Sequence, residues 1–375
     1  MQVKLELITP LWTADATKEA RHVEGTGIVG SLRWWYEALI RGLGGWACAP
    51  TGDGCELNME KFTQRRQRGC EHAGVGSLCL SCQQKALTES GLCAACQVFG
   101  ATSWARTFRL VVEEATQTGY PPTGRKRVYA ARRNARGGKP AYFFPPGRTG
   151  LLTLGVLPRR PGDEDTVRLV YGLLDFIRRN AALGAKTNLG YGLFEWEEEP
   201  EKLPDAAWLA AEVSRRAEVG RRGQNGRWPD LREMFFAEVE LPVRWQSGDF
   251  ANFKYDLRAA FREGEAIERL LSDEEERECL RHFLLGTTKT SSHQASKVKM
   301  ALLPDHRTLR VWGWVPKGLP GNVKRKAVMS LLYQRVRALG DISRWREFNS
   351  PWDTVNCFRP GQEEAYLRSL LEEGI

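Results

Sequence analysis

The chain has 375 residues, of which 42% are hydrophobic, and its 55 basic and 46 acidic side chains give a formal net charge of +9. This length predicts two or three domains with cores of their own, and the lack of an apolar run of about 18 residues excludes a membrane-spanning helix. Most of the basic residues are arginine, whose guanidinium group binds phosphate through paired hydrogen bonds, so the composition favours nucleic acid as a partner.

The first elements along the chain are a strand and a helix. Residues 2–9 alternate between apolar and polar side chains, which predicts a half-buried strand. A polar loop over residues 13–27 carries Arg21 and His22. Two glycines in a turn then lead into a helix that Ser31 can cap. Its apolar face has three- and four-residue spacing and consists of Leu32, Trp35, Tyr36, Leu39 and Ile40.

Three charged residues follow the opposite face of this helix. Arg33, Glu37 and Arg41 lie four residues apart, so Glu37 can pair with both arginines. One interpretation is a core helix with a solvated charged stripe. The other starts from Ser31 as the cap, which places Arg33 in the first turn, beside free backbone N–H groups that favour an anion. Because the helix dipole does not stabilise an arginine there, Arg33 is a candidate for binding an RNA phosphate.

Residues 44–98 form a cysteine-rich insertion. In the reducing cytoplasm, where we expect this protein, clustered cysteines indicate metal binding more than disulfides. Two Cys-x-x-Cys motifs can close a tetrahedron around one structural zinc ion with the thiolates of Cys79, Cys82, Cys93 and Cys96. Four further candidates would suffice for a second site or could replace one of these pairs, and the sequence leaves the choice open: Cys48, Cys55, Cys70 and His72.

Two later stretches suit a nucleic acid. Residues 119–149 form a basic loop with interleaved aromatic residues, which is typical of single-strand binding, although such a run can also be a solvated loop. Residues 183–194 form a glycine-rich turn into a strand. Its exposed backbone N–H groups would suit a phosphodiester backbone, and the alternative is a tight helix–strand connection.

The order of the elements predicts an α+β protein. Residues 1–198 read as strand, helix, two strands, helix and strand, which is a ferredoxin-like unit interrupted by the insertion and the basic loop. Residues 199–233 read as a helical linker. Residues 234–375 resemble the first unit in order and end in a helix near 362–373, but the pattern does not indicate where their last strand lies.

The sequence shows no convincing catalytic set. It has no phosphate-binding loop of the G-x-x-x-x-G-K-[ST] kind and no strand–G-x-G-x-x-G–helix unit. His22 could act as a general base on a ribose hydroxyl, but a single histidine without a visible partner is more often a surface or phosphate-facing residue. The same alternatives apply to His293.

These features together resemble the RAMP superfamily of CRISPR proteins. The resemblance rests on Gly30-Ser31-Leu32-Arg33-Trp34-Trp35, on Cys93-Ala94-Ala95-Cys96-Gln97-Val98-Phe99-Gly100 and on the glycine-rich loop 183–192. Within it, Thr9-Pro10-Leu11-Trp12 before the Trp-Trp helix, and Ser296-Lys297 before Leu309-Arg310-Val311-Trp312-Gly313-Trp314, are similar to the first-subunit family of the Cmr (type III-B) RNA-targeting complex.

The resemblance implies two tandem ferredoxin-like (RRM-like) domains and a non-catalytic subunit that holds the 3′ part of a guide RNA and its paired target RNA. We expect guide RNA, target RNA and other effector subunits as partners, with no membrane and no small-molecule substrate. The expected RNA contacts are Arg21, His22, Arg33, Arg125, Lys126, Arg127, Arg132, Arg133, Arg136, Gly184, Lys186, Thr187, Asn188, Gly190, Gly192, His293 and Lys297. The alternatives are a metal-independent, guide-processing endoribonuclease that uses His22 and a zinc-dependent interaction module.

Overall fold

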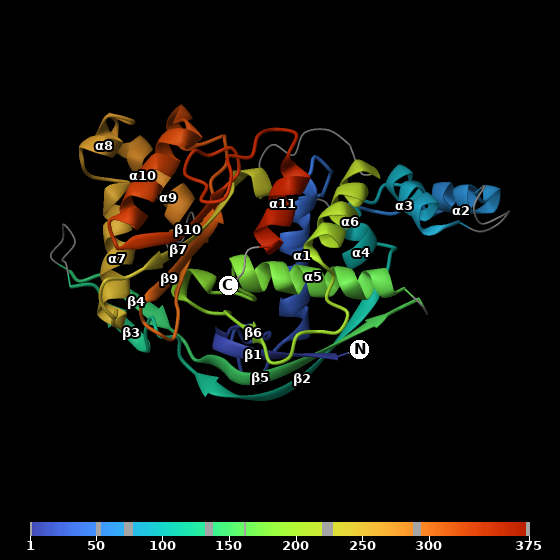
Figure 1. The fold of residues 1–375 in the computed structure, drawn as a ribbon, viewed down its shortest axis with the longest axis horizontal. Helices are drawn as coiled ribbons and strands as arrows, with labels where there is room; N and C mark the ends of the chain where they lie inside the picture. The colour runs from blue at the N-terminus through green and yellow to red at the C-terminus, as the bar shows by residue number, and fades with distance from the viewer. Residues whose placement is uncertain are drawn as a thin grey trace.

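A computed structural model describes residues 2–49, 54–70, 78–131, 138–160, 163–219, 228–287 and 294–372. It shows two α/β units side by side, with helices packed between and around two sheets (Figure 1). Candidates that fall outside the described ranges are His72, Arg132, Arg133, Arg136 and His293.

The first sheet has the expected ferredoxin-like topology. Its four strands are antiparallel and follow the order β2-β5-β1-β6. In the chain, α1 lies between β1 and β2, and α5 lies between β5 and β6. The register pairs Leu5 with Leu152, so the inward-facing side chains of both strands meet in the core. The elements are β1 (Gln2–Leu11), α1 (Gly25–Gly42), β2 (Phe108–Gly119), β5 (Gly147–Pro158), α5 (Glu164–Asn180) and β6 (Glu195–Trp196).

The second sheet repeats this topology. Its order, β10-β7-β9-β8, matches that of the first sheet strand for strand, so the duplication inferred from element order is confirmed. The last strand, which the sequence did not locate, is β10 (Asp341–Glu347). The sequence predicts one acidic helix near residues 264–284, and the structure divides this segment into two helices. The helix that precedes it, over Ser247–Ala260, was not predicted. The remaining elements are β7 (Met234–Glu240), α7 (Ser247–Ala260), α8 (Glu265–Glu268), α9 (Glu274–Leu285), β8 (Val298–Leu302), β9 (Thr308–Trp314) and α10 (Arg325–Arg337).

The insertions and the C-terminus add further elements. The C-terminal helix α11 packs against α5 and α6 of the first unit, although it follows the second unit in the chain (Figure 1). The basic loop contains a two-stranded hairpin of β3 and β4. These elements are α2 (Met59–Arg68), α3 (Leu80–Glu89), α4 (Ala94–Phe99), β3 (Lys126–Tyr129), β4 (Ala141–Phe144), α6 (Ala206–Val219) and α11 (Glu363–Glu372), with short 3-10 turns η1 (Thr187–Leu189), η2 (Leu231–Glu233) and η4 (Pro320–Asn322).

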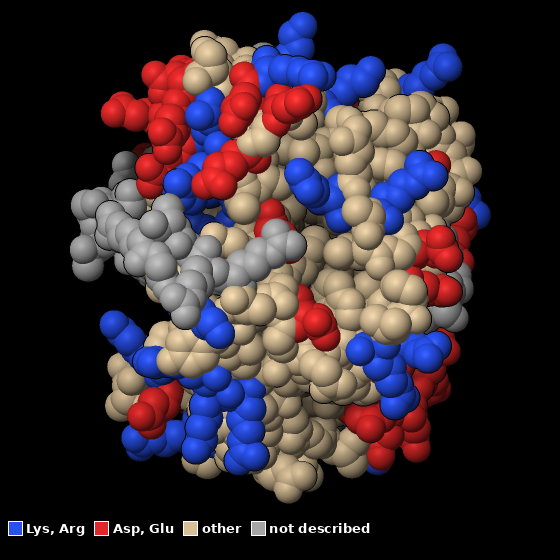
Figure 2. Space-filling model, turned by 90° about the vertical axis from the view of Figure 1, so that its left-hand side faces the viewer, with Lys and Arg blue, Asp and Glu red and all other residues tan. Residues whose placement is uncertain are grey.

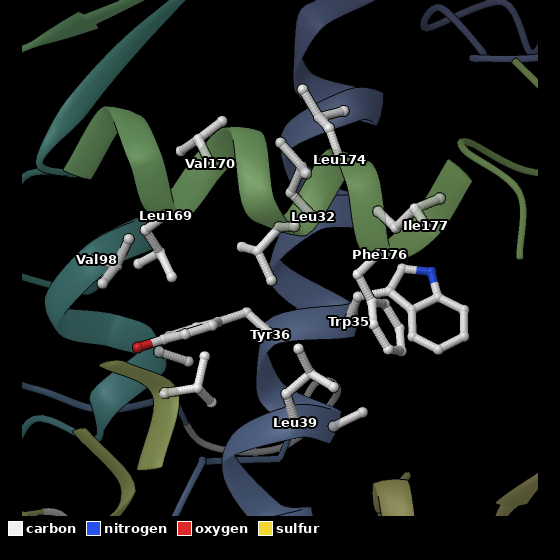
Figure 3. Packing of buried hydrophobic residues seen from close by; sticks show 14 of the residues in the cluster. Leu32, Trp35, Tyr36, Leu39, Val98, Leu169, Val170, Leu174, Phe176 and Ile177 are labelled. Atoms are coloured by element: carbon white, nitrogen blue, oxygen red, sulfur yellow. The ribbon is translucent and has the colours of Figure 1, made fainter. Parts of the chain in front are cut away.

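Helix α1 lies at the centre of the molecule, where it crosses α5 (Figures 1 and 3). The predicted apolar face is confirmed, because all five of its residues are buried. The predicted start is wrong. The helix begins at Gly25 with Glu24 in the N-cap position, and Ser31 is an internal helical residue whose hydroxyl accepts the N–H of Gly184 at 3.3 Å.

The charged stripe of α1 is also not solvated. Glu37 and Arg41 are each only 1% exposed. Glu37 pairs with Arg33 at 2.8 Å and with Arg41 at 3.4 Å, as the four-residue spacing predicted. Burial of charges at this depth requires further partners, and these lie in the cysteine-rich insertion.

The hydrophobic core of the first unit extends into the second. Trp35 of α1 packs against Phe236 of β7, with ring centroids 6.2 Å apart. Arg310 of β9 donates to the carbonyl of Arg178 at 2.7 Å, and Arg344 of β10 donates to the side chain of Asn180 at 2.7 Å. Both acceptors lie at the C-terminal end of α5, so this end of the helix fixes one unit against the other. No helix in the described part of the chain is long and apolar enough to cross a membrane.

Candidate nucleic-acid cleft and cysteine cluster

A large cavity lies between the two units. Its volume is about 1110 Å³, which is slightly above the range of about 300–1,000 Å³ for ligand pockets. The first half of α1, the glycine-rich loop, strands β8 and β9 and the segments that flank them form its walls. Six tryptophans line it: Trp12, Trp34, Trp35, Trp228, Trp312 and Trp314. The unit boundary therefore carries a concave, aromatic surface.

The tryptophans of this cleft have two roles. Trp35 and Trp312 are buried and support the wall, whereas Trp12, Trp34, Trp228 and Trp314 are half-buried and present part of their rings to the cavity. Trp34 meets the edge of Trp35 at 4.8 Å between ring centroids. Partly open indole rings of this kind are the surfaces on which nucleic-acid bases stack.

The charges that line the cleft are positive. Lys297 and Lys299 are the charged residues among its described lining. The ammonium group of Lys186 lies 4.3 Å from the ring centroid of Trp12, which is a lining residue. Burial lowers the pKa of Lys299 to about 8, and burial together with the nearby charge of Lys299 lowers the pKa of Lys297 to about 8. A desolvated ammonium group gains more from an incoming anion than a solvated one does.

The glycine-rich loop contributes to the cleft, but most of its amides are already used. Gly184 and Thr187 line the cavity. The N–H groups of Gly184, Gly190 and Gly192 donate to Ser31, Thr187 and Pro10, in that order, so they are not free for a phosphate. The backbone carbonyl of Asn188 accepts the ammonium of Lys254 at 2.7 Å.

The glycines of this loop are needed for close packing. Gly192 has a φ of +88°, and a Cβ there would lie 1.9 Å from the carbonyl oxygen of Leu183. Gly184 and Gly190 also have positive φ angles and close neighbours. The tight helix–strand connection that the sequence left as an alternative therefore explains the glycines, while Ala185 and Thr187 between them line the cleft.

The basic loop is an ordered hairpin where the structure describes it. Arg127 lies 4.3 Å from the ring centroid of Phe143 and 6.0 Å from that of Tyr129, and both rings are about half exposed. Arg125 lies 5.1 Å from the ring of Tyr120. Lys126 is exposed between these two arginines, at the start of β3.

This hairpin docks on the second unit. The N–H of Ala131 donates to the side chain of Asn252 on α7 at 2.6 Å, and Phe144 is buried in the second core. Acidic and basic side chains gather in separate patches on the face formed by the second unit (Figure 2). The hairpin therefore offers a basic, aromatic surface of its own outside the cleft lining.

Arg21 and His22 lie elsewhere, in the loop before α1, and neither lines the cleft. Arg21 is exposed and pairs with Glu19 at 2.7 Å. Nδ1 of His22 lies 2.7 Å from a carboxylate oxygen of Glu114 on β2. Burial alone would raise the pKa of Glu114, but its hydrogen bonds with His22, Thr116 and the backbone hold that pKa below the usual value. His22 therefore has the carboxylate partner that the sequence did not reveal.

The second feature of the site is a buried cluster of four cysteines. The Sγ atoms of Cys48, Cys55, Cys93 and Cys96 all lie within 4.8 Å of one another, and those of Cys48 and Cys96 are 3.5 Å apart. Four thiolates around a tetrahedral zinc ion lie about 3.8 Å from each other, as Zn–S bonds of about 2.3 Å require. These residues fit a zinc ion.

The predicted ligand set needs correction, because the two Cys-x-x-Cys motifs do not share a site. Cys93 and Cys96 join the buried cluster, whereas Cys79 and Cys82 group with Cys70. Each motif begins a helix, with its first cysteine in the N-cap position. Cys93, which caps α4, is buried, whereas Cys79, which caps α3, is partly exposed. The helices thus direct the two motifs to different partners, as the open alternatives allowed.

Arg33 belongs to the cysteine cluster and not to an anion site at a helix start. Its guanidinium group donates to Sγ of Cys96 at 3.2 Å and of Cys48 at 3.6 Å, and to the carbonyl of Gly100 at 3.1 Å. Burial alone would lower the pKa of Arg33, but Glu37 and the two cysteines raise it. As the helix begins at Gly25, Arg33 lies two turns inside it, so the prediction of a first-turn phosphate site is wrong.

Sequence analysis missed several residues of the cleft. Lys299, Trp34 and Trp228 were not singled out, and most tryptophans were assigned to the core. Two pairs gave the available signal: Trp312 and Trp314, two residues apart on a strand, and Lys297 and Lys299, two residues apart at the strand before it. Their meeting with α1 depends on the packing of the two units, which no local pattern predicts.

The family of the chain follows from a comparison of sequence profiles. The model of the RAMP superfamily matches residues 4–195, which is just over half of the chain. The chain belongs to the RAMP superfamily. The family resemblance inferred from the motifs is confirmed at this level, and the match covers the first ferredoxin-like unit, the cysteine cluster and the glycine-rich loop. No curated protein matches the sequence.

The chain is also similar to solved structures at low sequence identity. A chain in a cryo-EM structure of the type III-B Cmr-beta complex, bound to cognate target RNA and AMPPnP, shares 12% identity over 90% of this chain and 99% of its own length, with a TM-score of 0.43. Cmr1 from Pyrococcus furiosus, in its apo form, shares 14% identity over 86% of this chain and 90% of its own length, with a TM-score of 0.40. The family assignment rests on the superfamily model and not on these likenesses.

Proposed function

We propose that this RAMP protein is a non-catalytic, RNA-binding subunit of a type III-B CRISPR effector. In this proposal it holds the 3′ part of the guide RNA or the target RNA paired to it, and other effector subunits are its partners. The single observation that carries the proposal is the cleft, in which half-buried tryptophans and lysines meet and no carboxylate belongs to the described lining.

The chemistry of the cleft suits single-stranded RNA. Bases can stack on the open ring faces of Trp34 and Trp314, and stacking of this kind contributes about 1–3 kcal/mol per base. Lys297 and Lys299 lie near enough to these rings, in the same cavity, for a backbone phosphate to reach them. Because stacking tolerates any base and lysine contacts only charge, we expect little sequence preference.

The assignment to the type III-B complex rests on sequence motifs. The Gly-Ser-Leu-Arg-Trp-Trp helix contributes Trp34 to the cleft, and the segment that ends in Trp312-Gly313-Trp314 contributes its opposite wall. These two motifs thus meet at one surface. This convergence supports a shared role for them in binding.

We further propose that Cys48, Cys55, Cys93 and Cys96 hold a structural zinc ion. With four protein ligands no position remains for a substrate, so the ion would supply stability and no chemistry. The group of Cys70, Cys79 and Cys82 offers one described ligand fewer. The cluster links the chain before α2 to α4 and would fold an insertion whose helix α2 buries a single residue, Phe62.

Salt-dependent RNA binding tests the proposed function. Anisotropy of a fluorescein-labelled 12-nucleotide oligouridine would be measured with the full chain across a salt series, with the RNA checked on a gel. Lys299→Met should weaken binding and reduce the salt slope by about 0.7, because one phosphate contact is lost. The exposed Lys326 on α10 offers a matched control, Lys326→Met, which should change neither. A chain that does not bind the oligonucleotide at low salt would contradict the proposal.

One observation favours a second function. The 2.7 Å contact between His22 and Glu114 is the arrangement in which a carboxylate orients a histidine that acts as a base. A metal-independent endoribonuclease would cleave RNA in the presence of EDTA and lose that activity in His22→Ala. Against this function, His22 lies outside the cleft lining and is 76% exposed. Intact RNA after prolonged incubation would remove it.

A further inference from the structure

We propose that the cysteine cluster positions the α1 wall of the cleft through Arg33 and Arg41, so that metal binding at the cluster controls the affinity of the cleft for RNA. The inference rests on the proposed function for its RNA readout. Its metal readout is independent of that function.

The two faces of α1 point to different sites. Gly30, Ser31 and Trp34 line the cleft. Arg33 and Arg41 contact the cluster or the backbone that holds it. The helix is central in the fold and lies between these two regions (Figure 1). A displacement on the cluster side therefore changes the position of groups on the cleft side, because a packed helix moves as a rigid element.

Arg33 is the first link between the regions. It is next to Trp34 in sequence, and its guanidinium group contacts Glu37, Sγ of Cys96 and Sγ of Cys48. Metal-bound thiolates are strong acceptors for such a donor, whereas protonated thiols are weak ones. Arg33 is therefore held in place by the loaded cluster more firmly than by the empty one.

Arg41 is a second link, through the other wall of the cleft. Its guanidinium group donates to the carbonyl of Cys48 at 2.7 Å and to the carbonyl of Pro229 at 3.1 Å. Pro229 and its neighbour Trp228 line the cleft. One buried side chain thus joins the backbone of a cluster cysteine to the segment that carries a cleft tryptophan.

The arginines of α1 and a zinc-loaded cluster carry opposite charges. Glu37 is the carboxylate that pairs with both arginines, which leaves one positive charge between them. Four thiolates with a zinc ion supply a net charge of −2 beside Arg33. The loaded cluster would therefore attract the guanidinium group of Arg33, in addition to accepting its hydrogen bonds through sulfur.

The test measures zinc and RNA separately. Arg33→Met keeps the apolar stem and removes the hydrogen bonds to sulfur, and Arg109→Met, at an exposed position on β2, is its matched control. Zinc affinity would be determined by competition with a chromogenic chelator. We expect Arg33→Met to lower zinc affinity by about tenfold or more, as loss of a partner of the metal ligands typically does. Unchanged zinc affinity would overturn the inference, whether or not the chain binds RNA.

RNA affinity is the second measurement, and it should depend on zinc. We expect the wild-type chain to bind the 12-nucleotide oligouridine at least severalfold more weakly after chelation and to recover when zinc is added back. Arg33→Met should need a higher zinc concentration for the same recovery. If Arg33→Met fails to fold, the wild-type chain with and without zinc provides the comparison, with circular dichroism as the check on the fold.

The two possible failures can be told apart. RNA affinity that is equal with and without zinc, in a chain whose circular dichroism is also unchanged, would overturn the coupling and leave the proposed function intact. No RNA binding by the zinc-loaded wild-type chain would contradict the proposed function, and the zinc affinity of Arg33→Met would then decide the role of Arg33 by itself.

Discussion

The cleft and the cysteine cluster lie on two sides of the same helix and differ in almost every physical respect. The cleft is open, aromatic and positively charged, and it is lined by half-buried rings such as that of Trp34. The cluster is closed, and Cys93 and Cys96 are not exposed at all. One helix supplies a residue to each, Trp34 and Arg33, at adjacent positions in the sequence.

This difference teaches that a helix boundary decides function as much as residue type does. With Ser31 as the cap, Arg33 would lie at a helix start and suit a phosphate. With Glu24 in that position, the same arginine lies on an interior face and donates to sulfur. Variants on the cluster side should therefore change stability, and variants on the cleft side should change RNA affinity alone.

The largest effect is expected at the cluster. Cys96→Ser removes a buried thiolate that is 3.2 Å from Arg33 and should destabilise the chain by about 4 kcal/mol or more, because binding energy of a structural metal is folding energy. Thermal unfolding and zinc content measure this effect. Cys357→Ser, at an exposed cysteine outside both groups, is the control and should leave both values unchanged.

The glycine-rich loop gives the next largest effect. Gly192→Ala places a Cβ 1.9 Å from the carbonyl oxygen of Leu183 at a φ of +88°, and should cost about 2–4 kcal/mol in the free energy of unfolding. Gly30→Ala is the contrasting variant, because Gly30 is helical and no atom lies within 4 Å of its added Cβ. It should stabilise the chain by about 0.5–1 kcal/mol in urea unfolding. Equal effects of the two would contradict the packing role of Gly192.

On the cleft side, Trp34→Ala should reduce affinity for the oligouridine by about tenfold, because one base loses its stacking partner. The midpoint of urea unfolding should change much less than for the cluster variant. Trp208→Ala on α6 serves as the control, since Trp208 packs under Arg168 outside the cleft. A greater loss of affinity in the Trp208 variant would show that the binding surface lies elsewhere.

A smaller effect is expected from pH. The pKa of Lys297 and of Lys299 is about 8, so RNA affinity should fall severalfold between pH 7 and 9 as the two ammonium groups lose their protons. Stability should move in the opposite direction. The unfolded chain binds more protons than the folded chain between about pH 8 and the ordinary lysine pKa, so stability rises with pH in that window. Lys299→Met should reduce both slopes, and unchanged slopes would contradict these positions of the lysines.

Much of the fold could be predicted from the sequence because it depends on local patterns. The alternation in β1 and the apolar face of α1 are local, and so is the order of elements that gives two ferredoxin-like units. Helix α7 was missed, although its Phe250, Phe253 and Leu257 have the three- and four-residue spacing of an apolar helix face, and a glycine in its first turn weakens the pattern. Strand β10 carries four charged residues in seven, which hides its alternation.

The site could be predicted only in part. Four thiolates around one ion were expected, but Cys93 and Cys96 group with Cys48 and Cys55 and not with Cys79 and Cys82. The packing of the helices decides this grouping, and the spacing of the cysteines in the sequence does not predict it. Lys297, Gly184 and Thr187 were predicted and do line the cleft. Lys299 was not, because a lysine in a strand is distinguished only by what the neighbouring unit places in front of it.

The central claim is that single-stranded RNA binds in the cleft between the two units. Photo-crosslinking of a 4-thiouridine-substituted oligouridine to the zinc-loaded full chain, followed by peptide mass spectrometry, tests it most directly. We expect crosslinks to peptides that contain Trp34, Trp228 or Trp314, suppressed by unlabelled oligouridine and by high salt, with the RNA otherwise intact. Crosslinks confined to the β3–β4 hairpin or to the loop of Arg21 and His22 would contradict the claim.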